Sequence, residues 1–307
     1  MVHGTHNALD DPRNESIQIS INGELFNRNE ARISVFDSGY LVGDGVWEAL
    51  RLHQGVLVFL DLHLDRLWEG AAAIGMKLPF SREELTNQIG ATLKANQMTD
   101  NVHVRIMVTR GIKKTPSQDP RLTISGPNVV IIPEYKVASP KSRDEGITLF
   151  TSTIRRGSAD YLDPKLNCHS KLHEVQALVQ AIEAGADEAL MLDVNGFVST
   201  CNATNFFVVK RGEVWTSTGA YCMNGITRAK VIEACSRLGV ACHQKDFSLT
   251  DVYSADEAFV TGTFGGLTPV NRIDGRDIGT GSHAMIDKLR KGYHGLIQEE
   301  IDKNRLA

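Results

Sequence analysis

Residues 161–207 read YLDPKLNCHSKLHEVQALVQAIEAGADEALMLDVNGFVSTCNATNFF. Apolar residues recur at helical spacing between about residues 169 and 184, and Gly185 is typical of a helix end. Residues 188–193 then predict a strand, and the Asn195-Gly196 pair predicts a tight turn into a polar loop. The stretch therefore predicts a helix followed by a β-hairpin whose loop is rich in hydroxyl groups.

An amine stands at the start of this stretch, and a second helix begins shortly after it. Lys165 follows Asp163-Pro164 directly before the first helix. The Gly225-Ile226-Thr227-Arg228 segment opens another helix, and the backbone N–H groups at a helix start bind anions such as phosphate. An amine for an aldehyde and amides for a phosphate are the groups that pyridoxal phosphate requires.

Hairpins and helices alternate along the rest of the chain. Asn22-Gly23 and Asp274-Gly275 are two-residue turn pairs between apolar runs. Ser81 and Glu84 form a capping box that predicts a helix to about residue 94. Since several strand pairs are hairpins and no G-x-G-x-x-G motif opens a helix, the pattern argues against a purely parallel dinucleotide-binding fold. We predict an α+β fold of two domains.

A proline-containing, highly charged segment at residues 136–146 is the best candidate for a linker between the two domains. The first 15 residues are polar and have no regular pattern. We therefore predict a flexible N-terminal arm over residues 1–15 and a small α/β domain over residues 16–135. The short linker then joins this domain to a large domain over residues 147–307, which contains the opening stretch.

Composition limits the functional classes to which the chain can belong. Of its 307 residues, 42% are hydrophobic and 23% are charged, as in ordinary soluble enzymes. A net charge of −4 predicts no nucleic-acid surface, and no apolar run approaches the length of about 20 residues that a membrane helix needs. The five cysteines show no paired metal-ligand spacing, so we predict free thiols, no metal site and a cytoplasmic location.

Three further residues each have two interpretations from the pattern alone. Arg66 lies beside the apolar stripe of a predicted helix, where most arginines extend into solvent. Arg105 is a charged residue in the middle of a predicted strand and faces either solvent or an anion. Tyr40 belongs to the glycine-rich segment at residues 37–45, which is either a mobile surface loop or a loop packed on a site. We favour the second interpretation because the segment also contains apolar residues.

Taken together, these features resemble the class IV aminotransferases, which are pyridoxal phosphate enzymes of fold type IV. The family includes branched-chain aminotransferases, D-amino acid aminotransferases and aminodeoxychorismate lyases. The resemblance runs from about residue 17 to residue 296 and depends on the order and spacing of several motifs. These motifs are residues 43–48 (GDGVWE), 63–67 (HLDRL), 186–193 (ADEALMLD), 225–228 (GITR), 255–263 (ADEAFVTGT) and 268–270 (TPV).

The resemblance implies which residues bind the cofactor phosphate. Arg66 occupies the position of the family's phosphate-binding arginine, whose planar fork matches phosphate oxygens. Ile226 and Thr227 would supply backbone N–H groups and a hydroxyl to the same phosphate, helped by the helix start. Thr263 would add another hydroxyl. The interpretation of Arg66 as a solvent-facing arginine therefore gives way to a binding role.

The lysine that binds the cofactor aldehyde does not occupy its usual position. Counting back from Gly185, most of the family places this lysine where the present chain has Asn167, or one residue earlier. Lys165 lies two residues before Asn167 and would face the same side of a strand. Lys171 stands where branched-chain members carry a tyrosine that contacts the phenolic oxygen of the cofactor. We predict that Lys165 is the catalytic lysine, with Lys171 as the fallback.

A second departure from the family concerns the pyridine nitrogen of the cofactor. The family usually places a glutamate there, whereas this chain has Thr200. A threonine donates or accepts a hydrogen bond but supplies no counter-charge, so the electron sink is weaker. Asn205 matches the asparagine that ends the same loop, and we expect it to order that loop.

The resemblance implies an aminotransferase that acts on a small amino acid, branched-chain or D-configured, with a 2-oxo acid as acceptor. Tyr40, Trp47 and Arg105 would line the substrate side, where Arg105 would hold a carboxylate. The family also implies a homodimer. Two alternatives stay open. One is a lyase or β-eliminating enzyme similar to the aminodeoxychorismate lyases, which Thr200 favours. The other is a catalytically inactive relative that acts as a binding module.

Overall fold

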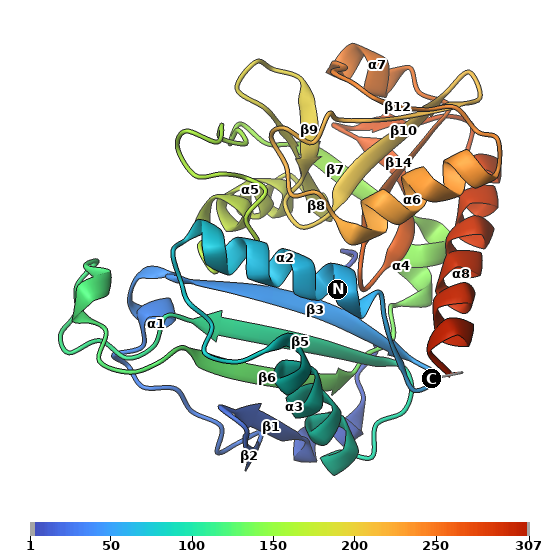
Figure 1. Cartoon of the computed structure of the whole chain (residues 1–307). Coiled ribbons are helices and arrows are strands. Elements are labelled where there is room, and N and C mark those ends of the chain that lie inside the picture. The colour runs from blue at the N-terminus through green and yellow to red at the C-terminus, as the bar shows by residue number, and fades with distance from the viewer. Residues whose placement is uncertain (1–3, 306–307) are drawn as a thin grey trace. The chain divides into compact units, whose positions relative to one another are not determined.

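A computed structural model describes residues 4–305 of the chain, which divides into two compact units. Unit 1 consists of Met1–Leu9, Ala138–Lys165 and Leu172–Glu299, and unit 2 consists of Asp10–Val137, Leu166–Lys171 and Glu300–Ala307. The chain contains both helices and two separate sheets, so the predicted α+β class is confirmed. Each unit is described by itself below (Figure 1).

Unit 2 is built on a six-stranded sheet in the order β2-β1-β6-β5-β3-β4, and every neighbouring pair is antiparallel. Its strands are β1 (Gln18–Ile21), β2 (Glu24–Asn27), β3 (Gly45–His53), β4 (Val56–Val58), β5 (Val102–Thr109) and β6 (Asn128–Tyr135). Asn22 and Gly23 both have positive φ, as the predicted two-residue turn between β1 and β2 requires.

Two helices of unit 2, α2 (Leu60–Ala73) and α3 (Arg82–Ala95), pack on this sheet, with α2 lying along β3 (Figure 1). Ser81 and Glu84 make the reciprocal capping box at the start of α3 that the sequence predicts. The core between helices and sheet includes Leu50, Leu67, Leu85, Ile89, Val104 and Ile106, all buried. The short helix α1 (Ser38–Val42) precedes β3 and carries Tyr40.

Unit 1 is built on a nine-stranded sheet in the order β12-β11-β10-β13-β14-β7-β8-β9, with β15 paired to β14. Its strands are β7 (Ile147–Thr151), β8 (Glu188–Leu192), β9 (Val198–Cys201), β10 (Asn205–Lys210), β11 (Glu213–Thr216), β12 (Cys242–Gln244), β13 (Glu257–Gly262), β14 (Gly266–Ile273) and β15 (Arg276–Asp277). The pair β8–β9 is the predicted hairpin of the opening stretch.

The helices of unit 1 are α4 (Pro140–Glu145), α5 (Leu172–Glu183), α6 (Ile226–Arg237) and α7 (Leu249–Tyr253). Helix α8 (Ala284–Arg305) belongs to unit 1 as far as Glu299. Phe206, Phe259 and Val260, from neighbouring strands, lie in the interior and are fully buried. The Phe207 and Phe259 rings stack with their centroids 4.9 Å apart. The sheet therefore supplies a rigid support for the loops at the ends of β9 and β13.

The boundaries between the units differ in part from the predicted domains. The division falls between Val137 and Ala138, inside the predicted linker, and residues 140–145 of this linker form helix α4. Pro140 occupies the first turn of this helix, where its missing N–H is tolerated. Leu166–Lys171 and Glu300–Ala307 group with unit 2, although both were expected in the large domain.

The N-terminal arm, expected to be flexible over residues 1–15, is attached where the structure describes it; residues 1–3 lie outside the described part. Thr5 is buried, and its backbone N donates to Glu188 Oε1 at 2.8 Å. The Thr5 hydroxyl donates to the same oxygen. Pro12–Ser16 form a short 3-10 helix. A buried carboxylate on β8 thus fixes a segment that looks featureless in sequence.

No helix within residues 4–305 is both long and apolar enough to cross a membrane. In the same part of the chain, no group of three or more His, Cys, Asp and Glu side chains is arranged to hold a metal ion.

Candidate cofactor and active site

The start of helix α6 forms an anion-binding cradle in unit 1. Gly225 is its N-cap residue, and no side chain caps the helix. Ile226 and Thr227 follow as the first helical residues, and both are buried. The N–H groups of this first turn donate no hydrogen bond to a side chain of the N-cap residue, and N–H groups at a helix start can bind a phosphate.

Asn205 fixes the backbone of the loop that leads into this cradle. Its Nδ2 donates to the carbonyl oxygen of Met223 at 2.9 Å. A Cβ atom added to Gly225 would stand 2.2 Å from Asn205 Oδ1, so only glycine permits this close approach. Asn205 therefore holds one carbonyl of the loop before α6 and contacts the last residue of that loop. The sequence predicts instead that Asn205 orders the loop that carries Thr200, and its Nδ2 also donates to the Thr200 hydroxyl at 3.4 Å.

Thr200 lies on β9 beside the same loop and is buried. Its hydroxyl donates to the carbonyl oxygen of Thr204 at 2.7 Å and accepts from Asn205 Nδ2 at 3.4 Å. The hydroxyl proton is therefore used within the protein, and the oxygen retains acceptor capacity. Thr263 is half-buried in the loop between β13 and β14, in the same unit.

Arg66, on α2 of unit 2, is held by a buried carboxylate. Its Nε and one terminal nitrogen donate to the two oxygens of Glu48 at 2.6 and 2.8 Å. His63 Nδ1 lies 2.7 Å from Glu48 Oε2. Burial alone would raise the pKa of Glu48, but hydrogen bonds from Arg66 and His63 lower it to about 2. Burial lowers the pKa of His63, so the cluster carries one carboxylate and one guanidinium.

Asn167 belongs to unit 2 because its segment extends the edge of β3. Trp47 N donates to the carbonyl oxygen of Asn167 at 2.9 Å, and His169 N donates to that of Gly45 at 3.0 Å. Asn167 Nδ2 donates to the Trp47 carbonyl at 2.7 Å and to Glu48 Oε1 at 3.4 Å. Asn167 Oδ1 is buried and has no hydrogen-bond partner within residues 4–305. The Asn167 side chain is thus a neutral amide held by backbone and side-chain contacts of β3.

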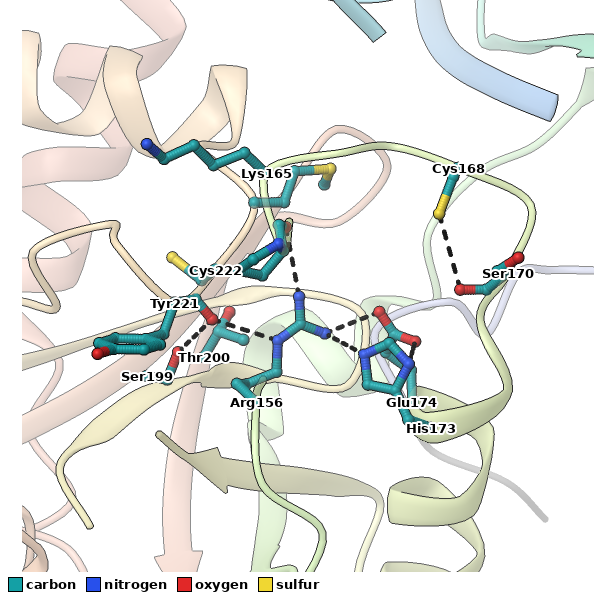
Figure 2. A network of polar contacts seen from close by, with 12 residues as sticks. Arg156, Lys165, Cys168, Ser170, His173, Glu174, Ser199, Thr200, Tyr221 and Cys222 are labelled. Atoms are coloured by element: carbon teal, nitrogen blue, oxygen red, sulfur yellow. Dashed lines mark hydrogen bonds and ion pairs between the residues drawn. The ribbon is translucent and has the colours of Figure 1, made fainter. Parts of the chain in front are cut away.

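The two candidate lysines fall in different units. Lys165 ends a segment of unit 1 and is exposed, and its backbone N donates to Asp163 Oδ1 at 2.9 Å. Its Nζ has no hydrogen-bond or ion-pair partner in the described part of the chain, and Figure 2 shows its side chain extending away from Glu174 and His173. Lys171 is half-buried in unit 2.

Trp47 and Arg105, two of the predicted substrate residues, are neighbours on the sheet of unit 2. The guanidinium carbon of Arg105 lies 4.2 Å from the centroid of the Trp47 ring. Burial lowers the pKa of Arg105, and no carboxylate of the described residues forms an ion pair with it. Trp47 Nε1 donates to the Cys168 carbonyl at 3.0 Å, which fixes the ring. Tyr40 is 75% exposed on α1 and joins neither residue through a hydrogen bond.

The structure adds a residue that pattern analysis passes over. Arg156 lies shortly after β7, is buried, and donates to the carboxylate of Glu174 at 2.7 Å (Figure 2). It also donates to the carbonyl oxygens of Pro164 and Tyr221. In the sequence nothing separates it from the adjacent Arg155, because its partners are one carboxylate and two backbone carbonyls that lie elsewhere in the chain.

The comparisons with known proteins identify the family of the chain. A family model for class IV amino-transferases matches residues 45–273, and the chain belongs to this family. Its core fold is that of the fold type IV branched-chain aminotransferases. A solved branched-chain amino acid aminotransferase with pyridoxamine 5'-phosphate superposes with a TM-score of 0.86 and is 28% identical, and the match covers 92% of this chain and 95% of that one.

Two relatives are similar along most of this chain. The branched-chain-amino-acid aminotransferase-like protein 2 of Arabidopsis thaliana is 40% identical over 290 residues, which are 94% of this chain and 52% of the relative. The putative branched-chain-amino-acid aminotransferase of Methanocaldococcus jannaschii is 36% identical over 278 residues, 90% of this chain and 94% of the relative. The chain therefore spans about half the length of the Arabidopsis relative.

Proposed function

We propose that the chain is a pyridoxal-phosphate-dependent aminotransferase that transfers the amino group of a small amino acid to a 2-oxo acid. The observation that carries the proposal is the uncapped start of α6, whose loop is fixed by Asn205 and permitted by Gly225. A cradle built in this way fits a phosphate, and it occurs in a chain of the class IV amino-transferase family.

The residues of the chain fit the cofactor at its phosphate end. Ile226 and Thr227 would hold the phosphate through backbone N–H groups and a hydroxyl, and Thr263 would add a second hydroxyl. Arg66 is proposed as the phosphate-binding arginine, because Glu48 binds one edge of its guanidinium and so fixes the orientation of the group. Thr200 would face the ring nitrogen with an oxygen that still accepts a hydrogen bond. When bound, the cofactor supplies an aldehyde for the amine and a ring that withdraws electrons.

Lys165 is proposed as the catalytic lysine. Its Nζ is exposed and unpaired in the described part of the chain, so it is available both to bind the aldehyde and to accept a proton. Lys171 remains the fallback. Asn167 cannot take this role, because a neutral amide is neither a nucleophile nor a base.

The substrate side is proposed to include Tyr40, Trp47 and Arg105. Arg105 lies over the Trp47 ring and forms no ion pair within hydrogen-bond distance in the described part of the chain, although Glu134 is near enough to act on its charge. A substrate carboxylate would supply a direct partner. The donor is proposed to be a branched-chain or a D-configured amino acid. Comparing L-leucine, L-valine and D-alanine as donors, with 2-oxoglutarate as acceptor, distinguishes these two classes.

Reconstitution tests the proposal directly. The purified protein is titrated with pyridoxal 5'-phosphate while the visible absorbance of the bound cofactor is recorded. The holoenzyme is then mixed with an amino acid but no 2-oxo acid. An aminotransferase stops after converting one equivalent per bound cofactor, whereas a lyase continues to release product. A protein that takes up no cofactor contradicts the proposal.

The chain is also proposed to form a homodimer and to work in a reducing compartment such as the cytoplasm. Helix α5 leaves four of its apolar residues exposed at helical spacing, namely Leu172, Val175, Val179 and Ile182. The sequence periodicity identifies this helix correctly, but much of its apolar stripe lies on the surface of the chain. Such a stripe suits burial against a second subunit. All five cysteines are free, as a reducing compartment requires. Light scattering of the purified protein measures the oligomeric state.

A further inference from the structure

Arg156 is the centre of a buried polar network in unit 1 (Figure 2). Its backbone N donates to the Leu192 carbonyl at 2.8 Å, which anchors the residue to the end of β8. One terminal nitrogen of the guanidinium donates to Glu174 Oε1 at 2.7 Å and lies 3.2 Å from His173 Nε2. Both ionic groups of the pair are more than nine-tenths buried, so their mutual orientation is fixed.

The opposite edge of the same guanidinium contacts two loops. Its second terminal nitrogen donates to the Pro164 carbonyl at 3.4 Å, directly before Lys165. Its Nε donates to the Tyr221 carbonyl at 3.3 Å. Ser199 Oγ donates to the same Tyr221 oxygen at 2.8 Å. One planar group therefore joins the backbone of two segments that are distant in sequence.

These two segments carry different parts of the proposed cofactor site. The first ends in Lys165, the proposed amine. The second runs from Tyr221 to Gly225 and becomes the phosphate cradle at the start of α6. Asn205 holds this second segment at the Met223 carbonyl, and Arg156 holds it at the Tyr221 carbonyl. Of these contacts, only those of Arg156 link the cradle segment to the lysine segment.

We propose that Arg156 is a positioning residue that sets the distance between the Lys165 segment and the phosphate cradle. The inference rests on the proposed function, and it adds a residue that touches neither the phosphate nor the amine. A ligand with both an aldehyde and a phosphate gains affinity from both segments only when their separation matches its length. A ligand with one of these groups needs only one segment.

The test compares three probes on the full-length wild-type protein and on Arg156→Lys. Pyridoxal 5'-phosphate engages both segments, inorganic phosphate engages only the cradle, and pyridoxal engages only the amine. Lysine keeps the charge beside Glu174 but lacks the planar fork that reaches both carbonyls. We expect the dissociation constant of pyridoxal 5'-phosphate to rise by about tenfold or more, while those of phosphate and pyridoxal change by less than about threefold.

Arg110→Lys is the matched control, because Arg110 in unit 2 has the same kind of partners. It donates to both oxygens of Asp44 and to the carbonyl oxygens of Ile74 and Gly75. Losing this fork should lower the melting temperature but leave the three dissociation constants unchanged. Arg156→Lys should differ from it by the selective loss of pyridoxal 5'-phosphate binding.

Glu174→Gln provides a second variant should Arg156→Lys fail to fold. The guanidinium keeps its carbonyl contacts but loses its charged partner, so we expect about threefold weaker binding of pyridoxal 5'-phosphate. In one outcome, the wild-type protein binds pyridoxal 5'-phosphate and the folded variants bind it with the same dissociation constant. That result leaves the proposed function intact but overturns the positioning role of Arg156. An equal loss for all three probes overturns it as well, because that marks a general structural effect. A wild-type protein that binds no cofactor instead contradicts the proposed function.

Discussion

Two arginines that pair with buried carboxylates serve different purposes in the two units. In unit 2, Arg66 directs its Nε and one terminal nitrogen to Glu48, and His63 completes a cluster between a helix and a strand. In unit 1, Arg156 gives only one nitrogen to Glu174 and directs the others to backbone carbonyls of two loops. The first pair orients an arginine, whereas the second orients backbone. The purpose of each pair is therefore indicated by the partners of its arginine, and the burial of the charges is less informative.

The largest expected effect comes from removing the carboxylate of the unit 2 cluster. Glu48→Ala leaves a guanidinium and a buried imidazole without their shared acceptor, so we expect the free energy of unfolding to fall by about 3–5 kcal/mol. Glu174→Ala should cost less, because Arg156 keeps its contacts with the Pro164 and Tyr221 carbonyls. Chemical denaturation of both variants measures the two losses in the free energy of unfolding. Equal losses would contradict the different purposes assigned to the two pairs.

The pH dependence of stability sharpens the same contrast. The pKa of Glu48 is about 2 in the folded protein and 4.5 for an ordinary glutamate, so the unfolded chain binds its proton first as the pH falls. The stabilisation is therefore complete above about pH 4.5 and is lost as the pH falls toward 2. Its size is about 3 kcal/mol. The stability difference between wild type and Glu48→Gln should shrink as the pH falls through this window, as measured by denaturant titration at each pH; a constant difference would contradict the assigned charge.

A smaller effect is expected at the cradle. Gly225→Ala places a methyl group 2.2 Å from Asn205 Oδ1, so we expect a loss of about 1–3 kcal/mol in stability together with weaker phosphate binding. Asn205→Ala removes the clash but also releases the Met223 carbonyl. The double variant should therefore lose less than the sum of the two single losses. Additive losses in thermal unfolding would show that the two residues do not constrain each other.

The smallest effect on stability is expected at the proposed amine. Lys165 is exposed and unpaired in the described part of the chain, so Lys165→Ala should change the free energy of unfolding by less than about 0.5 kcal/mol. The same variant should abolish amino-group transfer. Lys171→Ala serves as the comparison and should retain activity. Loss of transfer in Lys171→Ala but not in Lys165→Ala would exchange the two assignments.

Local patterns predict the parts of this fold that local interactions determine. The capping box of Ser81 and Glu84, the Asn22-Gly23 turn and the uncapped start of α6 all follow from residues within a few positions of each other. The helical periodicity of α5 is equally local, but it does not say what covers the apolar face. For that reason the sequence identifies the helix and not the exposure of its stripe.

Features that depend on distant backbone are not predictable in this way. Arg156 acts on the Tyr221 carbonyl 65 residues away, and any residue type supplies such a carbonyl. Asn167 joins the edge of β3 through backbone contacts with Trp47, which moves its segment into unit 2. The stacking of Arg105 on Trp47 likewise depends on the pairing of two strands. The family resemblance supplies candidate positions, while the structure supplies their partners.

Borohydride reduction of the pyridoxal 5'-phosphate complex, followed by peptide mapping, tests the central claim most directly. The reagent fixes the cofactor to the amine that holds its aldehyde. The account predicts a phosphopyridoxyl group on Lys165 and on no other lysine, with labelling lost in Lys165→Ala. A label on Lys171 would overturn both the lysine assignment and the role given to Arg156. No label on either lysine would contradict the proposed aminotransferase.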